Sequence, residues 1–230
     1  MRKFLRPFMY KKYINLVFFI NNLKPLFYDN KKSYSDFGED IIIEKLMNST
    51  CGSYIDVGAG HPKIGNNSYY FYKKGWRGVT IEPIKFHNSL HKIIRKGDVR
   101  IMKLVSENAI KMKFYEFNPT QYSTSSNEQY REMISKGMKE RRSYYVESIS
   151  INRAMSMVQN SNYFISIDCE GYDAAIIKSI NWNYHNLPQV IVFEKIKNQN
   201  EFAGVKSLLV KNGYNEVAST VNNLIYERKK

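Results

Sequence analysis

The sequence reads Ser53-Tyr-Ile-Asp-Val-Gly-Ala-Gly-His-Pro62 at the point that decides the fold of this 230-residue chain. The apolar residues before Gly58 predict a buried strand. Gly58 and Gly60 predict a tight turn in which the backbone approaches a ligand closely, and a following helix would point its first N–H groups at that ligand. Many such turns contain glycine, and the third glycine of the dinucleotide fingerprint is missing, so the turn alone is a weak signal.

Strands and helices alternate outward from this stretch. We expect strands at 78–82, 100–105, 111–117, 163–168 and 189–194, helices at 67–74, 83–95, 172–180 and 201–211, and a closing hairpin at 214–218 and 223–227. Residues 118–145 are polar and end in a charged piece that we expect to be helical. The alternation predicts a mostly parallel sheet with helices on both faces, whose ligand crevice lies beyond the carboxyl ends of the strands.

The second expected strand ends in Glu82. An acid about 20 residues past a glycine turn is placed to accept both hydroxyls of a ribose. Turn and acid together predict nucleoside binding, although a solvated glutamate after an ordinary turn would give the same pattern. Ser106 follows the third strand, where its hydroxyl either donates to the base or caps a turn.

Carboxylates gather where the fourth and fifth strands end, in Asp168-Cys-Glu170-Gly-Tyr-Asp173 and at Glu194. Asp168 or Glu170 fits a general base or a metal ligand. Asp168 and Glu194 offer the oxygen ligands that Mg²⁺ or Mn²⁺ prefers, or they balance nearby lysines. Asp173 also fits the acid that a helix N-terminus favours.

The chain carries 35 Lys and Arg against 21 Asp and Glu, a formal net charge of +14. This favours nucleic acid, phosphorylated small molecules or an acidic membrane surface as partners, unless it reflects only a bias toward Lys, Asn, Ile and Tyr. The apolar run Ile14–Ile20 is far shorter than the ~20 residues of a spanning helix. We expect residues 1–32 to form a helical extension that packs on this domain or a second subunit, or lies on a membrane.

Cys51 and Cys169 show no metal or redox spacing, which indicates a reducing, cytoplasmic setting.

The chain resembles the FkbM-type methyltransferase family from about Tyr34 to Glu194. The pieces that carry the resemblance occur in family order: Tyr34-Ser-Asp-Phe-Gly-Glu-Asp40, Tyr54-Ile-Asp-Val-Gly-Ala-Gly-His-Pro62, Lys74-Gly-Trp-Arg-Gly-Val-Thr-Ile-Glu-Pro83, Phe114-Tyr-Glu-Phe117, Phe164-Ile-Ser-Ile-Asp-Cys-Glu-Gly-Tyr-Asp173 and Val190-Ile-Val-Phe-Glu194. Asp36 stands where the family usually has Gln, and Cys169 where it often has Val. Neither change removes a carboxylate.

The resemblance implies a Rossmann-like, class I methyltransferase fold with a seven-stranded, mostly parallel sheet and an antiparallel C-terminal hairpin. Residues 33–230 would form this domain, with an acceptor-side insertion at about 118–145. It also implies S-adenosylmethionine as the methyl donor and an oxygen of a sugar or other small natural product as the acceptor.

Carried over by position, the resemblance assigns roles to individual residues. Those near the cofactor are Asp56, Gly58 and Gly60 at the methionine end, Glu82 at the ribose, Ser106 near the adenine, and Glu39 and Asp40 across the crevice. His61 and Asn66 are candidates for the acceptor side, and His61 fits a turn residue bonded to backbone equally well.

A sugar hydroxyl is a poor nucleophile, so the protein must orient it and remove its proton. We expect Asp168 and Glu170 to do so, with Glu194 assisting, and residues 118–145 to cover the acceptor. The expected partner is a sugar or nucleotide-linked sugar. An RNA methyltransferase is the alternative enzyme, although no RNA-binding motif is recognisable. A non-catalytic nucleoside-binding scaffold is a third, although it has no use for three acids at a crevice mouth.

Overall fold

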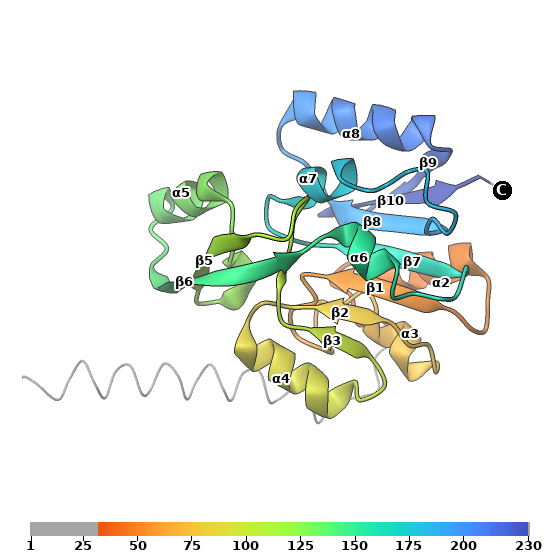
Figure 1. Ribbon diagram of the computed structural model, residues 1–230, viewed down its shortest axis with the longest axis horizontal. Coiled ribbons are helices and arrows are strands. Elements are labelled where there is room, and N and C mark those ends of the chain that lie inside the picture. Colours follow the sequence, from red (N-terminus) through yellow and green to blue (C-terminus); the bar gives the residue numbers. More distant parts are fainter. Residues whose placement is uncertain (1–31, 230) are drawn as a thin grey trace, which may run out of the picture.

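The computed structural model describes residues 32–229 and contains a central sheet of seven strands in the order β3-β2-β1-β7-β8-β10-β9 (Figure 1). The first five are parallel, and β10 runs antiparallel to both β8 and β9. The expected class I fold with an antiparallel closing hairpin is therefore confirmed. The strands are β1 (Ser53–Val57), β2 (Val79–Ile81), β3 (Val99–Ile101), β7 (Tyr163–Ile167), β8 (Val190–Glu194), β9 (Tyr214–Ser219) and β10 (Asn223–Arg228).

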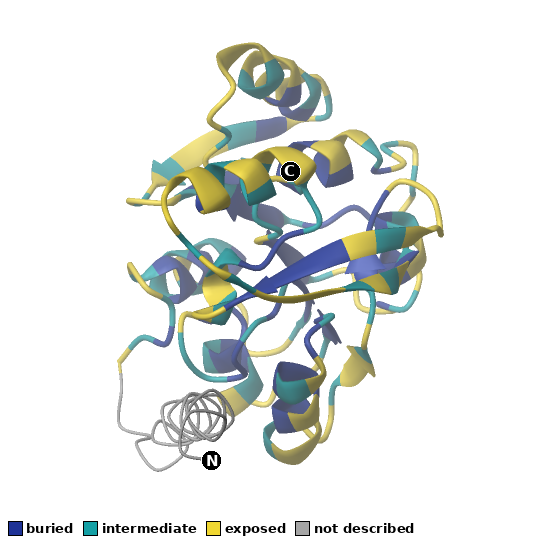
Figure 2. Cartoon of the chain, turned by 90° about the vertical axis from the view of Figure 1, so that its left-hand side faces the viewer, coloured by how far each residue is buried: buried dark blue, intermediate teal, exposed yellow. Residues whose placement is uncertain are grey.

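Helices cover both faces of this sheet, because each central strand is apolar on both sides. In β1, Ile55 and Val57 pack against α6 (Ile151–Met155), α7 (Asp173–Lys178) and α8 (Gln199–Lys211). Tyr54 points the other way and packs against α2 (Glu39–Met47) and α3 (Tyr69–Lys73). Side chains alternate along a strand, so Asp56 shares the α2 and α3 face with Tyr54. Figure 2 shows buried residues gathered on the strands between the layers.

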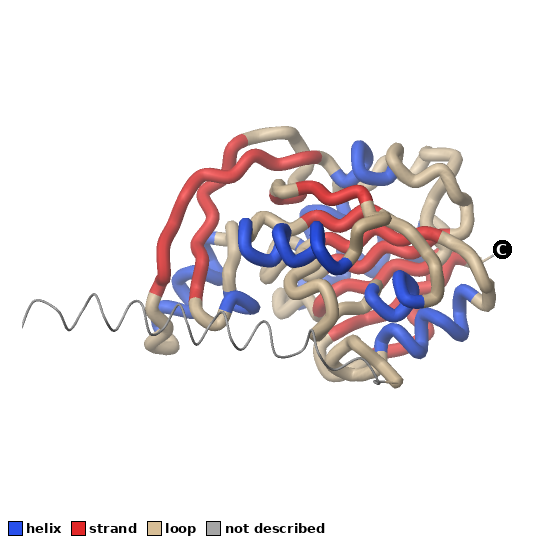
Figure 3. Tube along the Cα trace, turned by 90° about the horizontal axis from the view of Figure 1, so that it is seen from below, coloured by secondary structure: helices blue, strands red, loops and turns tan. Residues whose placement is uncertain are grey.

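A second, three-stranded sheet stands off one end of the molecule (Figure 3). It contains β4 (Leu104–Val105), β5 (Lys111–Phe117) and β6 (Glu140–Ile149). The 3-10 turn η2 (Thr120–Tyr122) and helix α5 (Asn127–Ser135) connect β5 to β6. Strands β5 and β6 pair antiparallel along almost their whole length. We call this pair, with its connection, the β5–β6 arm.

Two local predictions are wrong in this region. The strand expected at 100–105 is two strands, β3 and β4, which belong to different sheets. The charged piece that we expected to be helical does form a helix in its first part, α5, but strand β6 begins at Glu140, inside the stretch that we expected to be helical. Its residues Tyr144, Tyr145 and Val146 favour a strand, and pairing with β5 provides the partner that the local pattern does not reveal.

The expected helical extension at 1–32 lies outside the described residues, apart from its last position. No helix within residues 32–229 is long and apolar enough to cross a membrane.

Candidate active site

The turn after β1 is built by close backbone contact with two neighbouring strands. The N–H groups of Gly58 and Ala59 donate to the carbonyl of Ile81 at 3.0 and 3.1 Å, and the N–H of Asp168 donates to the carbonyl of Val57 at 3.0 Å. Gly58 has φ +73°, and a Cβ there would lie 1.8 Å from the Asp168 carbonyl oxygen. Only glycine fits this position, so the ends of β1 and β7 meet through it.

Glu82 follows β2 and supports the same turn with its carboxylate. Oε2 accepts the Gly60 N–H at 2.8 Å, and Oε1 accepts the Ile84 N–H at 2.7 Å. Burial raises the pKa of Glu82 to about 7. A carboxylate has about four lone-pair sites, so two remain for a ligand after these backbone bonds.

A cavity of about 530 Å³ opens where these strand ends meet. Gly58, Gly60 and Glu82 line it at the strand ends, and residues of the β5–β6 arm, among them Phe114 and Thr120, also line it. The volume lies within the range of small-molecule sites, roughly 300–1,000 Å³. The described lining residues include four acids and one lysine, namely Asp36, Glu82, Asp168, Glu170 and Lys103.

Two of these acids have strongly raised pKa values. Asp168 is exposed to the cavity itself, and the enclosing protein, together with the charge of Glu194, raises its pKa to about 7. Burial and the charge of Asp168 raise the pKa of Glu170 to about 9. Near neutral pH, Glu170 is therefore protonated and Asp168 is divided between its two forms.

Glu170 is also the link between the cavity and the β5–β6 arm. Its φ is +48°, an uncommon backbone conformation for a residue with a side chain. The Thr124 hydroxyl donates to the Glu170 carbonyl at 2.8 Å, and Gln129 on α5 donates to its carboxyl group at 3.3 Å. These bonds hold the connection between β5 and β6 over the cavity.

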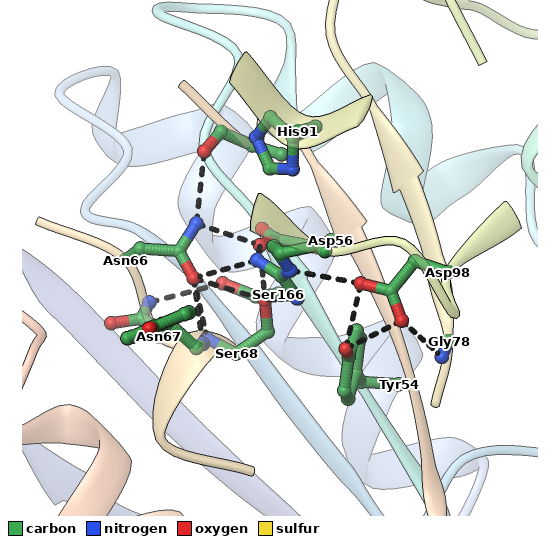
Figure 4. A network of polar contacts seen from close by, with 12 residues as sticks. Tyr54, Asp56, Asn66, Asn67, Ser68, Gly78, His91, Asp98 and Ser166 are labelled. Carbon is green, nitrogen blue, oxygen red and sulfur yellow. Dashed lines mark hydrogen bonds and ion pairs between the residues drawn. The ribbon is translucent and has the colours of Figure 1, made fainter. Parts of the chain in front are cut away.

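Asp56 and Asn66 lie next to each other in one polar network (Figure 4), and neither lines the cavity. Asp56 is buried, accepts bonds from Asn66 Nδ2 at 3.0 Å and from the Ser68 hydroxyl, and forms an ion pair with Arg95 at 3.7 Å. Asn66 also donates to the carbonyl of Ala59 at 2.9 Å. We expected Asp56 at the methionine end of the cofactor and Asn66 on the acceptor side. In the structure both residues instead support the turn after β1 through hydrogen bonds within the protein.

Two other expected site residues, Ser106 and Glu39, bond within the protein. Ser106 donates to the Asn108 carbonyl at 2.5 Å and does not line the cavity, which corresponds to the turn alternative. Glu39 accepts bonds from Thr220 at 2.6 Å and Asn223 at 2.9 Å, and so joins α2 to the hairpin of β9 and β10.

His61 does line the cavity, and its Nδ1 accepts the N–H groups of Lys63 and Ile64 at 3.1 and 3.3 Å. Asp40 accepts the N–H of Tyr34 at 2.6 Å and the hydroxyls of Ser33 and Ser35 at 2.6 and 2.9 Å. It therefore shapes the segment that leads to Asp36.

The structure gives no support to the Mg²⁺ or Mn²⁺ site expected at Asp168 and Glu194. Within the described part of the chain, no three His, Cys, Asp or Glu residues are arranged to hold a metal ion. Asp168 lines the main cavity, whereas Glu194 lines a separate, smaller one beside α5. Between them, Asp173 accepts the N–H groups of Cys169 and Glu194, both at 3.3 Å, and ties the ends of β7 and β8 together.

Sequence reasoning missed Arg95, which is fully buried at the end of α4 (Lys85–Ile94). Its guanidinium group bonds to Asp98 at 2.8 Å, Ser68 at 2.7 Å and Asn66 at 3.1 Å. From the same helix, His91 Nε2 is bonded to the Gly60 carbonyl at 3.1 Å. No local pattern marks Arg95, because its partners come from several separate segments.

Comparison with known proteins gives one family and several distant structures. The sequence profile of the methyltransferase FkbM domain matches residues 56–216. No curated protein matches the chain. A putative RNA methyltransferase from Pyrococcus horikoshii is similar at 9% identity, covers 92% of this chain and 97% of its own, and has a TM-score of 0.44. A TehB-like SAM-dependent methyltransferase from Corynebacterium glutamicum has 11% identity, covers 94% and 97%, and has a TM-score of 0.44. These likenesses are distant and do not bear on the acceptor.

Proposed function

The chain belongs to the FkbM family of S-adenosylmethionine-dependent methyltransferases, and from this premise we propose that it methylates a hydroxyl oxygen of a sugar carried on a nucleotide or a glycan. The observation that carries the proposal is the acid-lined cavity at the Gly58 turn, closed by a polar arm. The cavity suits a cationic nucleoside on one side and a hydroxylated acceptor on the other.

The cofactor side fits S-adenosylmethionine by charge and by hydrogen bonding. Glu82 keeps two lone-pair sites for the ribose hydroxyls after bonding the N–H groups of Gly60 and Ile84. Gly58 lets the ends of β1 and β7 meet beside the cavity, since a Cβ there would clash with the Asp168 carbonyl. The excess of acids in the lining favours a positive charge. When bound, the cofactor supplies an activated methyl group on a positively charged sulfur.

Asp168 and Glu170 have different roles toward the acceptor: Asp168 removes its proton, and Glu170 orients it. Asp168, with its pKa near 7, is the better general base, because a base works best when its pKa lies close to the working pH. Glu170, protonated near neutral pH, donates a hydrogen bond that orients the acceptor. His61 also lines the cavity, but its Nδ1 accepts backbone N–H groups, so it orients the acceptor rather than taking its proton.

The polar arm supports a sugar as the acceptor. It lines the cavity with amide and hydroxyl side chains that bond hydroxyl groups, namely Asn118, Thr120, Gln121, Ser123 and Ser125. A second candidate is RNA methylation, which the net charge of +14 favours. The cavity wall itself is acidic, which repels a polyanion at the point of chemistry.

We also propose that the enzyme works in the cytoplasm, because Cys51 and Cys169 are both free thiols. We further propose that residues 1–32 contact a membrane surface and that the protein associates into oligomers.

The test is transfer of labelled methyl groups from S-adenosylmethionine to three sets of acceptors: nucleotide-linked sugars, glycan fragments and total RNA. We expect label on a sugar hydroxyl and none on RNA, with the Asp168→Asn protein as the inactive control. S-adenosylmethionine should raise the melting temperature, and NAD should not. Label on RNA with none on any sugar would overturn the choice of acceptor, and no stabilisation by the cofactor would overturn the site.

A further inference from the structure

Glu116 on β5 is fully buried and bonded to two arginines of β6. Arg141 Nη1 donates to Oε1 at 2.6 Å, and Arg142 Nε donates to Oε2 at 2.8 Å. The Tyr144 hydroxyl also donates to Oε2, at 3.0 Å. One carboxylate therefore stands against two guanidinium groups, and the cluster carries a net charge of +1.

The arginines are held in place but remain accessible. The side chain of Arg142 is 52% exposed and that of Arg141 29%, whereas Glu116 is inaccessible. The guanidinium of Arg142 also lies over the Tyr144 ring, 5.0 Å from its centre. A guanidinium has five N–H donors, and Arg142 uses only its Nε and Nη2 edge on Glu116. When an anion binds to an arginine that is already ordered, the arginine loses less side-chain entropy.

The cluster lies beside the cavity. Glu116 is two residues from Phe114 and two from Asn118, both of which line the cavity, so about 7 Å of strand separates it from either. Phe114 and Glu116 lie opposite Tyr144 and Arg142 in the ladder, and alternation puts all four on one face of the arm. Glu82 lies close enough that the charge of Glu116 contributes to its raised pKa, after the larger contributions of burial and of the charge of Asp56.

Both guanidinium groups face the one carboxylate of Glu116. Nearby, residues 136–142 contain four basic residues and one acid, in the sequence Lys-Gly-Met-Lys-Glu-Arg-Arg. The Glu116 cluster is positive, ordered and accessible, and it lies next to a cavity lined by acids. This arrangement would suit a ligand with one anionic part and one neutral part. A neutral hydroxylated part enters the cavity, and an anionic part stays outside.

We propose that Arg142, oriented by Glu116 and assisted by Arg141, binds a phosphate group of the methyl acceptor. This inference rests on the proposed function and narrows it to phosphorylated acceptors. Arginine is suited to the role because its planar fork matches phosphate oxygens in pairs. A phosphate held here leaves the sugar that it carries within reach of the cavity.

The first experiment measures binding of inorganic pyrophosphate by calorimetry. We expect Arg142→Gln to weaken binding at least about tenfold, the loss of one charged hydrogen bond. Arg142→Lys, which keeps the charge but loses the fork, should fall between. Lys111→Gln is the matched control, because it removes one positive charge from β5, on the face of the arm opposite to that of Glu116 and Arg142. It should change the affinity less than about twofold.

S-adenosylhomocysteine is titrated into the same four proteins. Equal affinity in all of them shows that they fold and that the cofactor site is intact. If the unaltered protein binds S-adenosylhomocysteine but not pyrophosphate, or if Lys111→Gln weakens pyrophosphate as much as Arg142→Gln, the phosphate site is refuted and the proposed function stands. If the unaltered protein binds no S-adenosylhomocysteine, the proposed function fails on its own.

An oligouridylate titration separates a small acceptor from RNA. A single phosphate site gives a shallow dependence on salt, whereas a protein that neutralises several phosphates loses affinity steeply. Tight, steeply salt-dependent oligouridylate binding that is lost in Arg142→Gln, with no pyrophosphate binding, would overturn the assignment to a small acceptor.

Discussion

Within residues 32–229, the cavity and the β5–β6 arm both contain carboxylates, but the carboxylate of the arm is paired with arginines, and Asp168 and Glu170 in the cavity are not. Glu116 in the arm meets two guanidinium groups. Among the described residues, no lysine or arginine forms an ion pair with Asp168 or Glu170, and their pKa values rise instead. An enclosed acid must be paired or take up a proton. The carboxylate of the arm is therefore balanced by arginines of the same arm, whereas Asp168 and Glu170 have no such partner in the described part of the chain and would be balanced by a bound cation.

The largest effect should come from removing the base in the cavity. Replacing Asp168 with Asn keeps the shape and removes the proton acceptor, so kcat should fall by roughly 10² or more. Affinity for S-adenosylhomocysteine should change far less. In the unaltered enzyme, the rate should rise with pH toward about 7 as Asp168 ionises. Near-normal turnover in both Asp168→Asn and Glu170→Gln would show that these acids are structural.

The next effect concerns Glu82, which lines the cavity and accepts hydrogen bonds from two backbone N–H groups. Glu82→Ala should weaken S-adenosylmethionine binding at least about tenfold, because hydrogen bonds to charged groups contribute about 1.5–3 kcal/mol each. Glu107→Ala, at an exposed position, is the control. Calorimetry that finds equal affinity in both variants would remove Glu82 from the ribose role.

The smallest effect is on the stability of the folded protein. It tests whether Glu170 is accommodated by taking up a proton, whereas Glu116 is accommodated by ion pairs. Glu170 has its pKa raised to about 9 from 4.5, so the folded protein holds a proton that the unfolded chain has released. Its contribution to stability is complete below about pH 4.5 and is lost as the pH rises through about 9.

Glu170→Gln imitates the protonated form and should remove part of this pH dependence. The melting temperature of the variant should exceed that of the unaltered protein increasingly between pH 7 and pH 10, by about 2–4 °C for each kcal/mol gained. Glu147→Gln, at an exposed position paired with Lys103, is the control and should show no such gain. Parallel curves for Glu170→Gln and the unaltered protein would mean that Glu170 is ionised at neutral pH.

The sequence predicted those parts of the site that depend on neighbouring residues. The Gly58 turn and Glu82 each follow a strand with clear local signals, and the structure brings both to one cavity. Asp56 was misplaced because a strand buried on both faces gives no sign of which side a polar residue faces. Strand β6 and the Arg142 cluster were missed because their partner, β5, lies more than twenty residues earlier in the chain.

The pairing of β1 with β7 also has a consequence for synthesis of the protein. Ser53 pairs with Tyr163, and Val57 with Ile167, so β1 leaves the ribosome long before its central neighbour exists. At roughly 5–20 residues per second, the delay is on the order of ten seconds. During this time one edge of β1 is open, and the wall that contains Asp168 is missing. The nascent chain therefore cannot use its cofactor to stabilise early folding, and any protection of that edge must come from elsewhere, such as a chaperone.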